Sequence, residues 1–556
     1  MPEKPKVQFT LDGRALEAPE GSLVIDAAKA AGVEIPHYCY HPALGNPGVC
    51  RLCIVEVEGQ PKPAVSCRLP VKAGLVVKAN SPRAKRAQAS SLEFHLANHP
   101  LDCPVCDQAG ECWLQDYYMR FGLYKSSVRE DKVHKGKALP IGPNVMLDQE
   151  RCILCTRCTR FLDQVTQTHE LGIFNRGDRD VLAPYPGRQV DNPYAGNVVD
   201  ICPVGALTDT DFRFKVRVWY LDETPALCTG CARGCSIDVH ANNRRPWHTP
   251  EQRVVRFKPR HNPEVNGYWM CDEGRYSYKQ IDSTLRLTLA SRLSAGEPRH
   301  VGAQEAARRA AQELSALAKQ KGSEGLAVVL SGTLSNEDLY AARRLFVDVL
   351  RAGVVVARPG PDQLGSEDQL LRRPEKVPNH AGAEALGFGR TIAERGLAEL
   401  HEAVASGKVW GLFVVDRDPV SVWGERGEAL VKGLAFTAYQ GSHANRFSSI
   451  AQWVLPACSY AEEEATFTNF QGQVQRARAA VPPLGESRPD WEIFSDMLAV
   501  LGEDVAGWTS ASALFALLAE QEATFAGLSF ERLGPFGKRL GSGSPQAGKV
   551  MAEARK

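Results

Sequence analysis

The sequence predicts a multidomain protein of mixed α/β and α+β class, and two observations support this prediction. The chain has 556 residues, too many for a single hydrophobic core and enough for three to five domains. Its character also changes near residue 278: fifteen of its sixteen cysteines fall before residue 272, whereas later segments alternate between helical and strand periodicity. We therefore expect several small cysteine-rich domains followed by one larger α/β domain.

The first domain begins with a strand, an Asp12-Gly13 hairpin turn and a second strand. Ser22 is expected to cap a short helix that ends at Gly32. A cysteine loop follows, and the segments CIVEVEG and LVVKA read as two further strands. A hairpin, a helix and returning strands predict a small ferredoxin-like β-grasp domain.

The rest of the chain is divided in the same way. A helical pattern at 82–99 leads into the second cysteine-rich segment, and FRFKVRVWYL at 212–221 is expected to close the third domain as a strand. Alternating helix and strand patterns after 278 predict an α/β domain, and the Gly-, Ser- and Lys-rich tail from 536 is expected to be flexible. The expected domains are 1–80, 81–125, 126–221, 222–277, 278–502 and a C-terminal extension at 503–556.

Composition excludes several classes of protein. Lys and Arg total 66 against 65 Asp and Glu, so no excess charge favours binding to nucleic acid. The N-terminal segment lacks the apolar core of a signal peptide, and the longest apolar runs are too short to span a bilayer. Disulfide frameworks belong mainly to small secreted chains, so the CxxC spacings favour metal binding over disulfides.

The cysteines fall into four groups, and each has the ligand count of one iron–sulfur cluster once a single histidine is added. Such a row of redox centres indicates a protein that moves electrons rather than one that makes or breaks substrate bonds. The groups are Cys39, Cys50, Cys53 and Cys67; His99, Cys103, Cys106 and Cys112; Cys152, Cys155, Cys158 and Cys202; and Cys228, Cys231, Cys235 and Cys271.

The first two groups differ in chemistry. The spacing of the first suits a 2Fe-2S cluster, with Gly45 and Gly48 letting the backbone approach the sulfides; a zinc ribbon is the alternative. In the second group His99 completes three cysteines, and His95, one helical turn earlier, is its rival. A neutral imidazole in place of a thiolate would raise the reduction potential of that cluster.

The third and fourth groups have 4Fe-4S spacing, and zinc is an alternative for the fourth. In the third group the CP cysteine, Cys202, most simply completes the CxxCxxC set. Arg151, Arg157 and Arg160 place positive charge beside it, which either favours the reduced state or is an ordinary solvated face. Cys458 belongs to no group, and we expect it to be a small buried apolar residue.

At these residues the chain resembles the large iron–sulfur subunit of respiratory complex I, the G-subunit family of NADH-quinone oxidoreductase. The matching stretches are IPHYCYHPALGNPGVCRLCIVEVEG, HPLDCPVCDQAGECWLQD, RCILCTRCTRFLDQV with GNVVDICPVGALTD, and CTGCARGCSIDV with Cys271. The resemblance implies one 2Fe-2S cluster and three 4Fe-4S clusters, with His99 as the histidine ligand. All four groups are present, although the fourth cluster occurs in only some members of that family.

The segment after 278 is similar to a shortened molybdopterin-oxidoreductase domain, most clearly in WVLPACSYAEEEATFTNFQGQVQRA. No cysteine lies between 271 and 458 to ligate molybdenum, and nothing after 502 resembles the barrel that encloses the pterin in that class. We therefore expect an α/β scaffold without molybdopterin.

The resemblance also implies a function. It is an electron-transfer subunit that passes electrons from NADH, through a flavin on a partner subunit, toward quinone, coupled in the whole complex to ion translocation. The implied partners are the flavin- and NADH-binding subunit, a small 2Fe-2S subunit and the quinone-module subunits. The implied location is peripheral, on the cytoplasmic side of the bacterial inner membrane, with membrane contact only through partners. No catalytic residue is expected.

Other functions share this N-terminal architecture. No GxGxxG motif follows a strand and no GxxxxGK[ST] motif is present, so NADH and flavin are expected to bind elsewhere. The alternatives are the large subunit of an NAD-linked molybdenum or tungsten formate dehydrogenase, the diaphorase part of an NAD-reducing hydrogenase, and an interaction scaffold with structural zinc sites.

Overall fold

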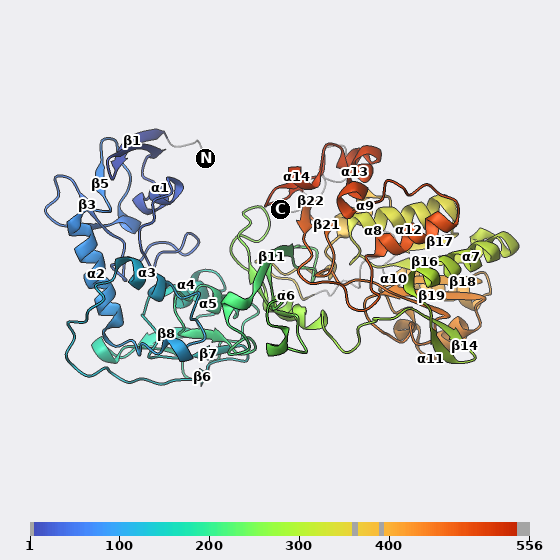
Figure 1. The fold of residues 1–556 in the computed structure, drawn as a ribbon, viewed down its shortest axis with the longest axis horizontal. Helices are drawn as coiled ribbons and strands as arrows, with labels where there is room; N and C mark the ends of the chain where they lie inside the picture. The colour runs from blue at the N-terminus through green and yellow to red at the C-terminus, as the bar shows by residue number, and fades with distance from the viewer. Residues whose placement is uncertain (1–4, 358–364, 389–393, 542–556) are drawn as a thin grey trace. The chain divides into compact units, whose positions relative to one another are not determined.

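The computed structural model describes residues 5–357, 365–388 and 394–541, and these residues form two compact units (Figure 1). Unit 1 is Met1–Tyr220 and unit 2 is Leu221–Lys556. Among the described residues, no helix combines the length and the apolar character that crossing a membrane requires. The part of the predicted flexible tail beyond residue 541 lies outside the described residues.

Unit 1 begins with a five-stranded sheet in the order β2-β1-β5-β3-β4. The first two strands form an antiparallel hairpin that turns at Asp12 and Gly13, which both have positive φ angles, as the sequence predicts. Helix α1 buries Val24 and Ala28 against this sheet, which completes the predicted β-grasp arrangement. The elements are β1 (Lys6–Leu11), β2 (Arg14–Pro19), α1 (Val24–Ala30), β3 (Ile54–Val57), β4 (Ala64–Val65) and β5 (Val76–Lys78).

The rest of unit 1 consists of short elements between long loops. Helix α2 starts with Ser81 as N-cap, whose hydroxyl accepts a hydrogen bond from the Ala84 N–H at 3.1 Å. A three-stranded sheet (β10-β7-β6) and a hairpin (β8-β9) follow. The elements are α2 (Pro82–Ala97), α3 (Trp113–Phe121), β6 (Leu139–Pro140), β7 (Val145–Leu147), α4 (Arg157–Gln164), β8 (Leu171–Phe174), β9 (Val181–Pro184), α5 (Asn197–Asp200) and β10 (Leu207–Asp209).

Unit 2 contains a seven-stranded sheet in the order β15-β14-β20-β19-β18-β16-β17, with parallel pairing from β20 to β17. Its central strands are continuous apolar runs because helices cover both faces. Val328 and Leu330 of β16 pack on the side of α7, α8, α12 and α13, whereas Ala327 and Val329 pack with residues of α10 and α11. This confirms the α/β class predicted for the second half.

The elements of this sheet and its helices are β14 (Ser291–Ser294), β15 (Glu297–His300), α7 (Ala303–Lys321), β16 (Leu326–Leu330), α8 (Asn336–Ala342), β17 (Val354–Ala357), α9 (His380–Ala385), α10 (Glu394–Ala405), β18 (Gly411–Val415), α11 (Pro419–Lys432), β19 (Phe436–Gly441), β20 (Trp453–Pro456), α12 (Asp490–Val500), α13 (Ala511–Gln521) and α14 (Phe530–Leu533). Two three-stranded antiparallel sheets complete the unit. The first consists of β11 (Asp222–Leu227), β12 (Ser236–Ala241) and β13 (Val254–Pro259) and is followed by the short helix α6 (Asp272–Arg275). The second consists of β21 (Ala465–Thr468), β22 (Gln473–Ala477) and β23 (Lys538–Arg539).

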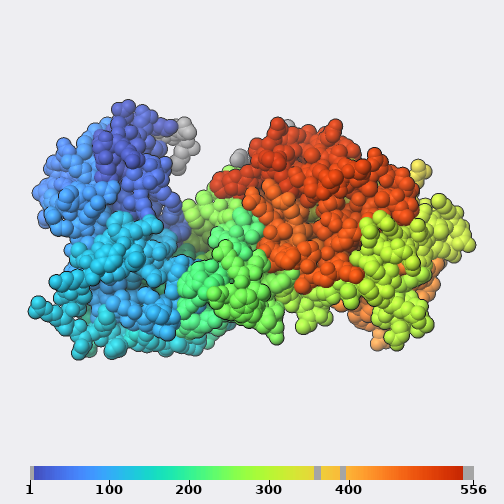
Figure 2. All heavy atoms as spheres, viewed as in Figure 1, coloured from blue at the N-terminus to red at the C-terminus, as the bar shows by residue number. Residues whose placement is uncertain are grey.

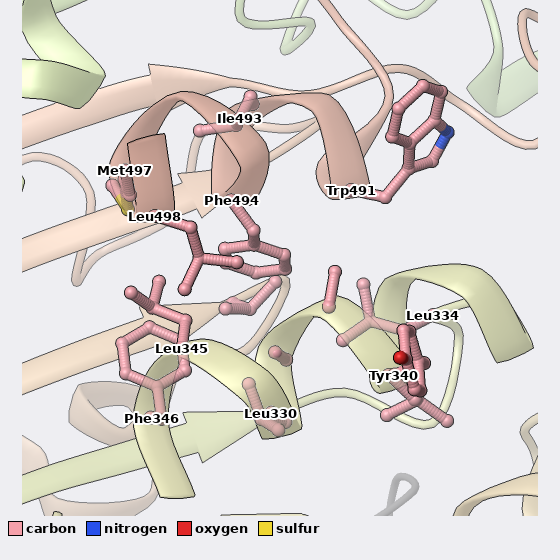
Figure 3. Packing of buried hydrophobic residues seen from close by; sticks show 14 of the residues in the cluster. Leu330, Leu334, Tyr340, Leu345, Phe346, Trp491, Ile493, Phe494, Met497 and Leu498 are labelled. Atoms are coloured by element: carbon pink, nitrogen blue, oxygen red, sulfur yellow. The ribbon is translucent and has the colours of Figure 1, made fainter. Parts of the chain in front are cut away.

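Helix α12 is central to the larger core of unit 2 (Figure 3). Its Phe494 ring lies edge-on to Phe346, at 5.8 Å between ring centroids, and Leu498 points into the same cluster. Phe346 lies in a π-helical segment, Arg343–Val349, that continues α8. Residues beyond 502 join this core through Leu514 and Phe515 of α13, and the red C-terminal residues pack against the rest of the unit in Figure 2.

The space at the carboxyl ends of the parallel strands, where ligands bind in open α/β sheets, is taken up by the chain's own strand β21. Thr466 donates hydrogen bonds to the carboxyl oxygens of Glu337 from its N–H and its hydroxyl, both at 2.9 Å. The Thr468 hydroxyl donates to Asn336 at 3.1 Å, and its N–H donates to Asn379 at 2.7 Å. Side chains of α8 and α9 thus bind backbone and hydroxyl groups of this chain.

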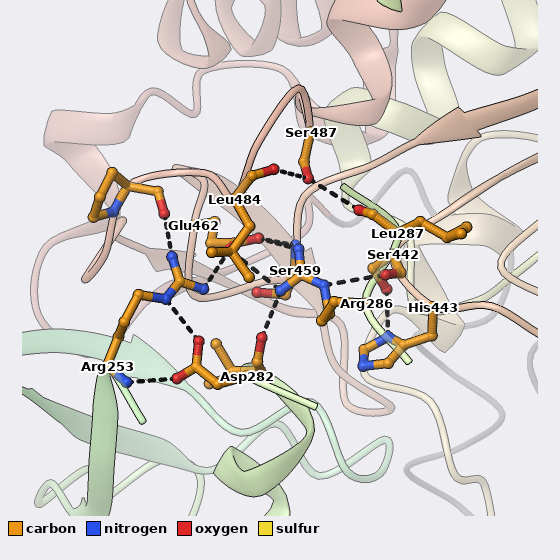
Figure 4. Close-up of polar contacts among 12 residues, drawn as sticks. Arg253, Asp282, Arg286, Leu287, Ser442, His443, Ser459, Glu462, Leu484 and Ser487 are labelled. Atoms are coloured by element: carbon orange, nitrogen blue, oxygen red, sulfur yellow. Dashed lines mark hydrogen bonds and ion pairs between the residues drawn. The ribbon is translucent and has the colours of Figure 1, made fainter. Parts of the chain in front are cut away.

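A buried ion-pair network joins β13 to the α/β layer within unit 2 (Figure 4). The carboxylate of Glu462 accepts hydrogen bonds from Arg286 and from Arg253, both at 2.6 Å, and Arg253 also pairs with Asp282. Although burial alone would raise it, the pKa of Glu462 lies below its ordinary value because of these two guanidinium groups. Removing one partner would leave a buried charge uncompensated. The network therefore holds β13 in place against the α/β layer.

Three local predictions are wrong. The Ser22 hydroxyl donates to the Pro19 carbonyl at 2.6 Å, and Leu23 takes the N-cap position of α1. Residues 212–221 form turns and a 3-10 segment instead of a strand, because the Phe214 N–H bonds to the Asp107 carboxylate. At the start of the supposed tail, Lys538 and Arg539 form strand β23 beside β22.

Glu337 provides a test of the filled crevice. Burial raises its pKa to about 8, so between pH 4.5 and about 8 the folded protein binds more protons than the unfolded chain and loses stability as pH rises. Glu337→Gln keeps both contacts to Thr466 but cannot titrate. We therefore expect its free energy of unfolding to fall less steeply with pH in this range than that of the wild type, by up to about 1.4 kcal/mol per pH unit. Urea unfolding at several pH values measures it, with Glu425→Gln on the exposed face of α11 as the control. Parallel pH profiles for wild type and Glu337→Gln would contradict the assignment.

Candidate metal centres

The first cysteine group lies in the loops beside the β-grasp sheet, and all four of its thiols are buried. The thiols of Cys39 and Cys50, Cys39 and Cys67, and Cys53 and Cys67 lie within hydrogen-bonding reach, so the four form one connected set. The backbone N–H of Cys39 points at the Cys50 sulfur, 3.5 Å away.

Loop geometry around this first set follows from two glycines. Gly45 and Gly48 have φ angles of 73° and 71°, a region that residues with a Cβ adopt reluctantly. A Cβ on Gly48 would also lie 2.8 Å from Cδ of Arg68. The Asn46 side chain donates to the Cys67 carbonyl at 2.7 Å and so closes the loop onto the 3-10 turn that carries the fourth thiol.

The second group lies between α2 and α3. Cys112 immediately precedes α3, and Cys106 is buried so closely against Gly205 that a Cβ there would lie 2.5 Å from the sulfur. His99 is only 9% exposed, and burial lowers its pKa to about 4, so its imidazole is neutral, the form that binds metal. Nearby, Arg151 lowers the pKa of Asp102 to about 2 through an ion pair at 2.7 Å.

The rival histidine is engaged elsewhere. The His95 ring nitrogen Nε2 lies 3.0 Å from the carbonyl oxygen of Cys50, and the ring packs edge-on against Tyr38 at 5.1 Å between centroids. His95 therefore supports the loop of the first group, and this placement favours His99 as the fourth ligand of the second.

The third group surrounds a small, mainly apolar hollow that is lined by all four cysteines. Leu154 and Thr156 have φ angles of 52° and 63°, which bend the CxxCxxC loop around this space before α4 begins. The Cys202 sulfur approaches from a separate segment and lies 3.0 Å from the Val204 carbonyl oxygen. Both positive-φ residues carry a Cβ, so the surrounding contacts must offset the backbone strain.

The fourth group, in unit 2, lines a similar small hollow. Cys228, Cys231 and Cys235 lie on the loop between β11 and β12, and Cys271 is the N-cap of α6. The Gly230 N–H points at the Cys228 sulfur at 3.5 Å, and the Gly274 N–H at the Cys271 sulfur at 3.4 Å. Such N–H groups stabilise negative charge on sulfur.

The residues present fit iron–sulfur clusters. Each group offers four soft or borderline ligands in a buried site, with backbone donors or missing side chains beside the sulfurs. Within the described ranges, no three His, Cys, Asp or Glu residues converge on a point that could hold a single metal ion.

Cys458 stands apart from these groups, as the sequence suggests. It lies two residues after β20 and is buried, and burial together with the acidic groups of Glu463 and Glu462 raises its pKa. It is therefore a protonated thiol in a carboxyl-rich interior. Sequence reasoning missed the polar residues that bond to strand β21, Asn336, Glu337 and Asn379. The signal that could have found them was the run of polar residues at the start of a helical pattern.

Four buried cysteine-rich sites on small domains, followed by an α/β scaffold, define an iron–sulfur protein of the electron-transfer class. Models of five protein families match the chain in an order that agrees with this. They are described as a 2Fe-2S iron-sulfur cluster binding domain (residues 4–82), an NADH-ubiquinone oxidoreductase-G iron-sulfur binding region (88–127), an NADH-quinone oxidoreductase subunit 3 ferredoxin-like domain (142–208), a molybdopterin oxidoreductase Fe4S4 domain (221–283) and molybdopterin oxidoreductase (379–500).

Similar proteins carry related names. The chain is 31% identical to the mitochondrial NADH-ubiquinone oxidoreductase 78 kDa subunit of Neurospora crassa, over 89% of this chain and 81% of that protein. It is 29% identical to the G subunit of NADH-quinone oxidoreductase from Rickettsia felis, over 90% and 88%. With the G subunit from Streptomyces coelicolor it shares 41% identity over 61% of this chain, but the match covers only 39% of that longer protein.

The chain therefore belongs to the family of NADH-quinone oxidoreductase G subunits, which includes the mitochondrial 78 kDa subunit. It is an iron–sulfur subunit of an oxidoreductase complex and serves electron transfer. A solved structure, the crystal structure of NAD+-reducing [NiFe]-hydrogenase in the H2-reduced state, is also similar over 38% of this chain and 91% of that chain, at 35% identity and a TM-score of 0.35.

Gly274 offers a direct test of the fourth site. A Cβ there would lie 2.7 Å from the Cys228 sulfur, whereas a Cβ on Gly230, in the same site, would lie 3.5 Å from it, an ordinary contact. We expect Gly274→Ala to lose about four irons per chain and one 4Fe-4S signal, while Gly230→Ala keeps them. Iron analysis with electron paramagnetic resonance checks this. Equal iron in the two variants would show that the close approach is unimportant.

Substitutions can also decide which histidine, His99 or His95, is the fourth ligand of the second group. His99→Ala should lose the second-group cluster, or keep it with an altered signal, because one of four ligands is gone. His95→Gln, which retains a group able to bond the Cys50 carbonyl, should keep every cluster. The measurement is again iron content with the spectrum of each cluster, and loss of a 4Fe-4S signal in His95→Gln alone would reverse the assignment.

Proposed function

We propose that this chain holds one 2Fe-2S cluster at its first cysteine group and one 4Fe-4S cluster at each of the other three, and relays electrons from NADH oxidation toward quinone. The observation that supports this most strongly is the four-ligand count of every group, together with the burial of all proposed ligands except Cys103, Cys152 and Cys202, which are partly exposed. In the whole complex this transfer would be coupled to ion translocation.

The clusters, when bound, supply the capacity to accept and release single electrons at potentials set by their surroundings. The chain's own residues provide those surroundings. Buried thiolates and the neutral His99 ring fix the ligand charge, and the amides of Gly230 and Gly274 direct N–H groups at sulfur. Twelve of the fifteen ligand cysteines are buried, which limits their contact with water and strengthens the electrostatic effect of each fixed charge and dipole on the potential.

The α/β half acts in this proposal as a scaffold without molybdopterin. Strand β21 and its partners Asn336, Glu337 and Asn379 use the carboxyl-end space of the sheet for contacts within the chain. A pterin would have to displace these hydrogen bonds, several of which are fully buried and therefore costly to break.

The proposed partners are a flavin- and NADH-binding subunit, a small 2Fe-2S subunit and the quinone-module subunits of the complex. The names of the similar proteins support partnership with subunits that react with NADH and quinone. We place the chain on the cytoplasmic side of the bacterial inner membrane, attached through those partners.

Metal analysis of the purified complex tests the proposal. Four clusters contribute roughly fourteen irons to this chain, two from the first group and four from each of the others. Cys235→Ala should lose about four of them, whereas Cys458→Ala, the matched control, should lose none. Molybdenum or tungsten near one per chain would contradict the scaffold role and favour a formate dehydrogenase, and zinc in place of iron would contradict the redox role altogether.

A further inference from the structure

Arg157 lies where loops from three ligand groups meet in unit 1. It is the first residue of α4, between Cys155 and Cys158, and its side chain is buried, with 2% exposed. One terminal nitrogen, Nη2, donates to the Tyr40 carbonyl at 2.7 Å, and the other, Nη1, donates to the Ile201 carbonyl at 3.3 Å. Tyr40 follows Cys39 of the first group, and Ile201 precedes Cys202 of the third.

The second group contributes an aromatic contact to the same guanidinium. The Trp113 ring lies 4.3 Å from the Arg157 guanidinium carbon, close enough for a cation–π interaction. Trp113 follows Cys112, and its backbone N–H bonds to the carbonyl of Pro203, next to Cys202. One cation therefore contacts residues adjacent to ligands of all three groups in this unit.

The charge of Arg157 has no carboxylate partner in the described part of the chain. Both of its hydrogen bonds go to neutral carbonyls, and its Nε has no hydrogen-bond partner there. Arg151, by contrast, pairs with Asp102 at 2.7 Å and with Asp148 at 3.4 Å. A buried cation without a counter-charge is strongly unfavourable, so an anionic group must lie close to Arg157.

The ligated cysteines are the negative groups within reach. The groups whose ionised forms favour the charge of Arg157 are Cys155, Tyr117, Cys202 and Cys39. Burial raises the pKa of Tyr117 to about 12, which keeps it neutral, whereas each thiolate that binds metal carries a negative charge. The next arginine along α4 extends the pattern, because Arg160 donates to the carbonyls of Cys39 and Leu44 in the first loop. Arg151, Arg157 and Arg160 therefore do not form a solvated basic face. That was one of the two interpretations that the sequence left open.

We propose that Arg157 is a positioning residue shared by the first and third centres, where its fixed positive charge stabilises the reduced state and its two carbonyl contacts hold the loops in register. This inference rests on the proposed function. Reduction adds one electron and one negative charge to a centre, with no bond made or broken and no proton moved, and a buried cation nearby favours that added charge. A guanidinium suits this task because it stays charged and spans two acceptors with a planar fork.

The test is a redox titration of the purified complex with dithionite, followed by electron paramagnetic resonance and iron analysis. In Arg157→Gln we expect native iron content. At the potential that half-reduces the wild type, the ratio of reduced to oxidised first- and third-group centres should be tenfold lower. This corresponds to a midpoint potential that is lower by about 59 mV. Arg157→Lys keeps the charge and should stay close to wild type. Arg188→Gln, which removes a positive charge from the exposed surface of the same unit, is the control and should not change the titration.

The outcomes separate this inference from the function on which it rests. Wild-type protein without cluster signals would overturn the proposed function itself. Native titration of both centres in Arg157→Gln would overturn only the role of Arg157. If Arg157→Gln fails to retain iron, Arg157→Lys decides: native iron and titration there support the role of the charge. Loss of iron in both variants leaves Arg157 only its part in holding the loops and refutes its role in stabilising the reduced state.

Discussion

The burial of thiolate sulfur is the constraint on which the cysteine-rich part of this protein depends. Metal-binding thiolates carry negative charge, and a low-dielectric interior tolerates several of them together only beside cations and hydrogen-bond donors. The backbone around the sites is shaped by this need: Leu154 and Thr156 adopt positive φ angles, and Gly205 leaves open the space that the Cys106 sulfur fills. These segments contain few helices and strands because their backbone conformation positions the sulfurs instead of forming regular backbone hydrogen bonds.

The α/β half follows a different rule. Its sheet is covered on both faces by helices, and strand β21 takes up the hydrogen bonds of buried side chains beside the carboxyl ends of the parallel strands. Two kinds of buried acid coexist there. Glu462 is ionised between Arg286 and Arg253, whereas burial raises the pKa of Glu337 to about 8 and keeps it protonated at neutral pH. The first fixes neighbouring segments by charge, and the second by neutral hydrogen bonds.

Local pattern accounts for what could be predicted from the sequence. The Asp12-Gly13 hairpin, helix α2 and the apolar strands β16 and β18 depend on neighbouring residues, and ligand spacing marked the four cysteine groups. The failure at Ser22 is local, since its hydroxyl bonds to Pro19, but the others have non-local causes. Residues 212–221 alternate like a strand, yet Arg217 donates to the carbonyls of Cys106 and Pro104, more than a hundred positions earlier. The setting of Arg157 was equally hidden, since its Tyr40 contact spans 117 residues.

The contacts of Arg160 bear on how the protein is made. This side chain donates to the Cys39 and Leu44 carbonyls across 121 and 116 residues. During synthesis the N-terminal β-grasp sheet leaves the ribosome first, but the loop carrying Cys39 gains these hydrogen bonds only after α4 has followed. Closing so long a connection costs considerable chain entropy, which the later contacts must offset. A nascent chain that stops before residue 160 therefore presents its first cysteine loop without the two hydrogen bonds that Arg160 donates.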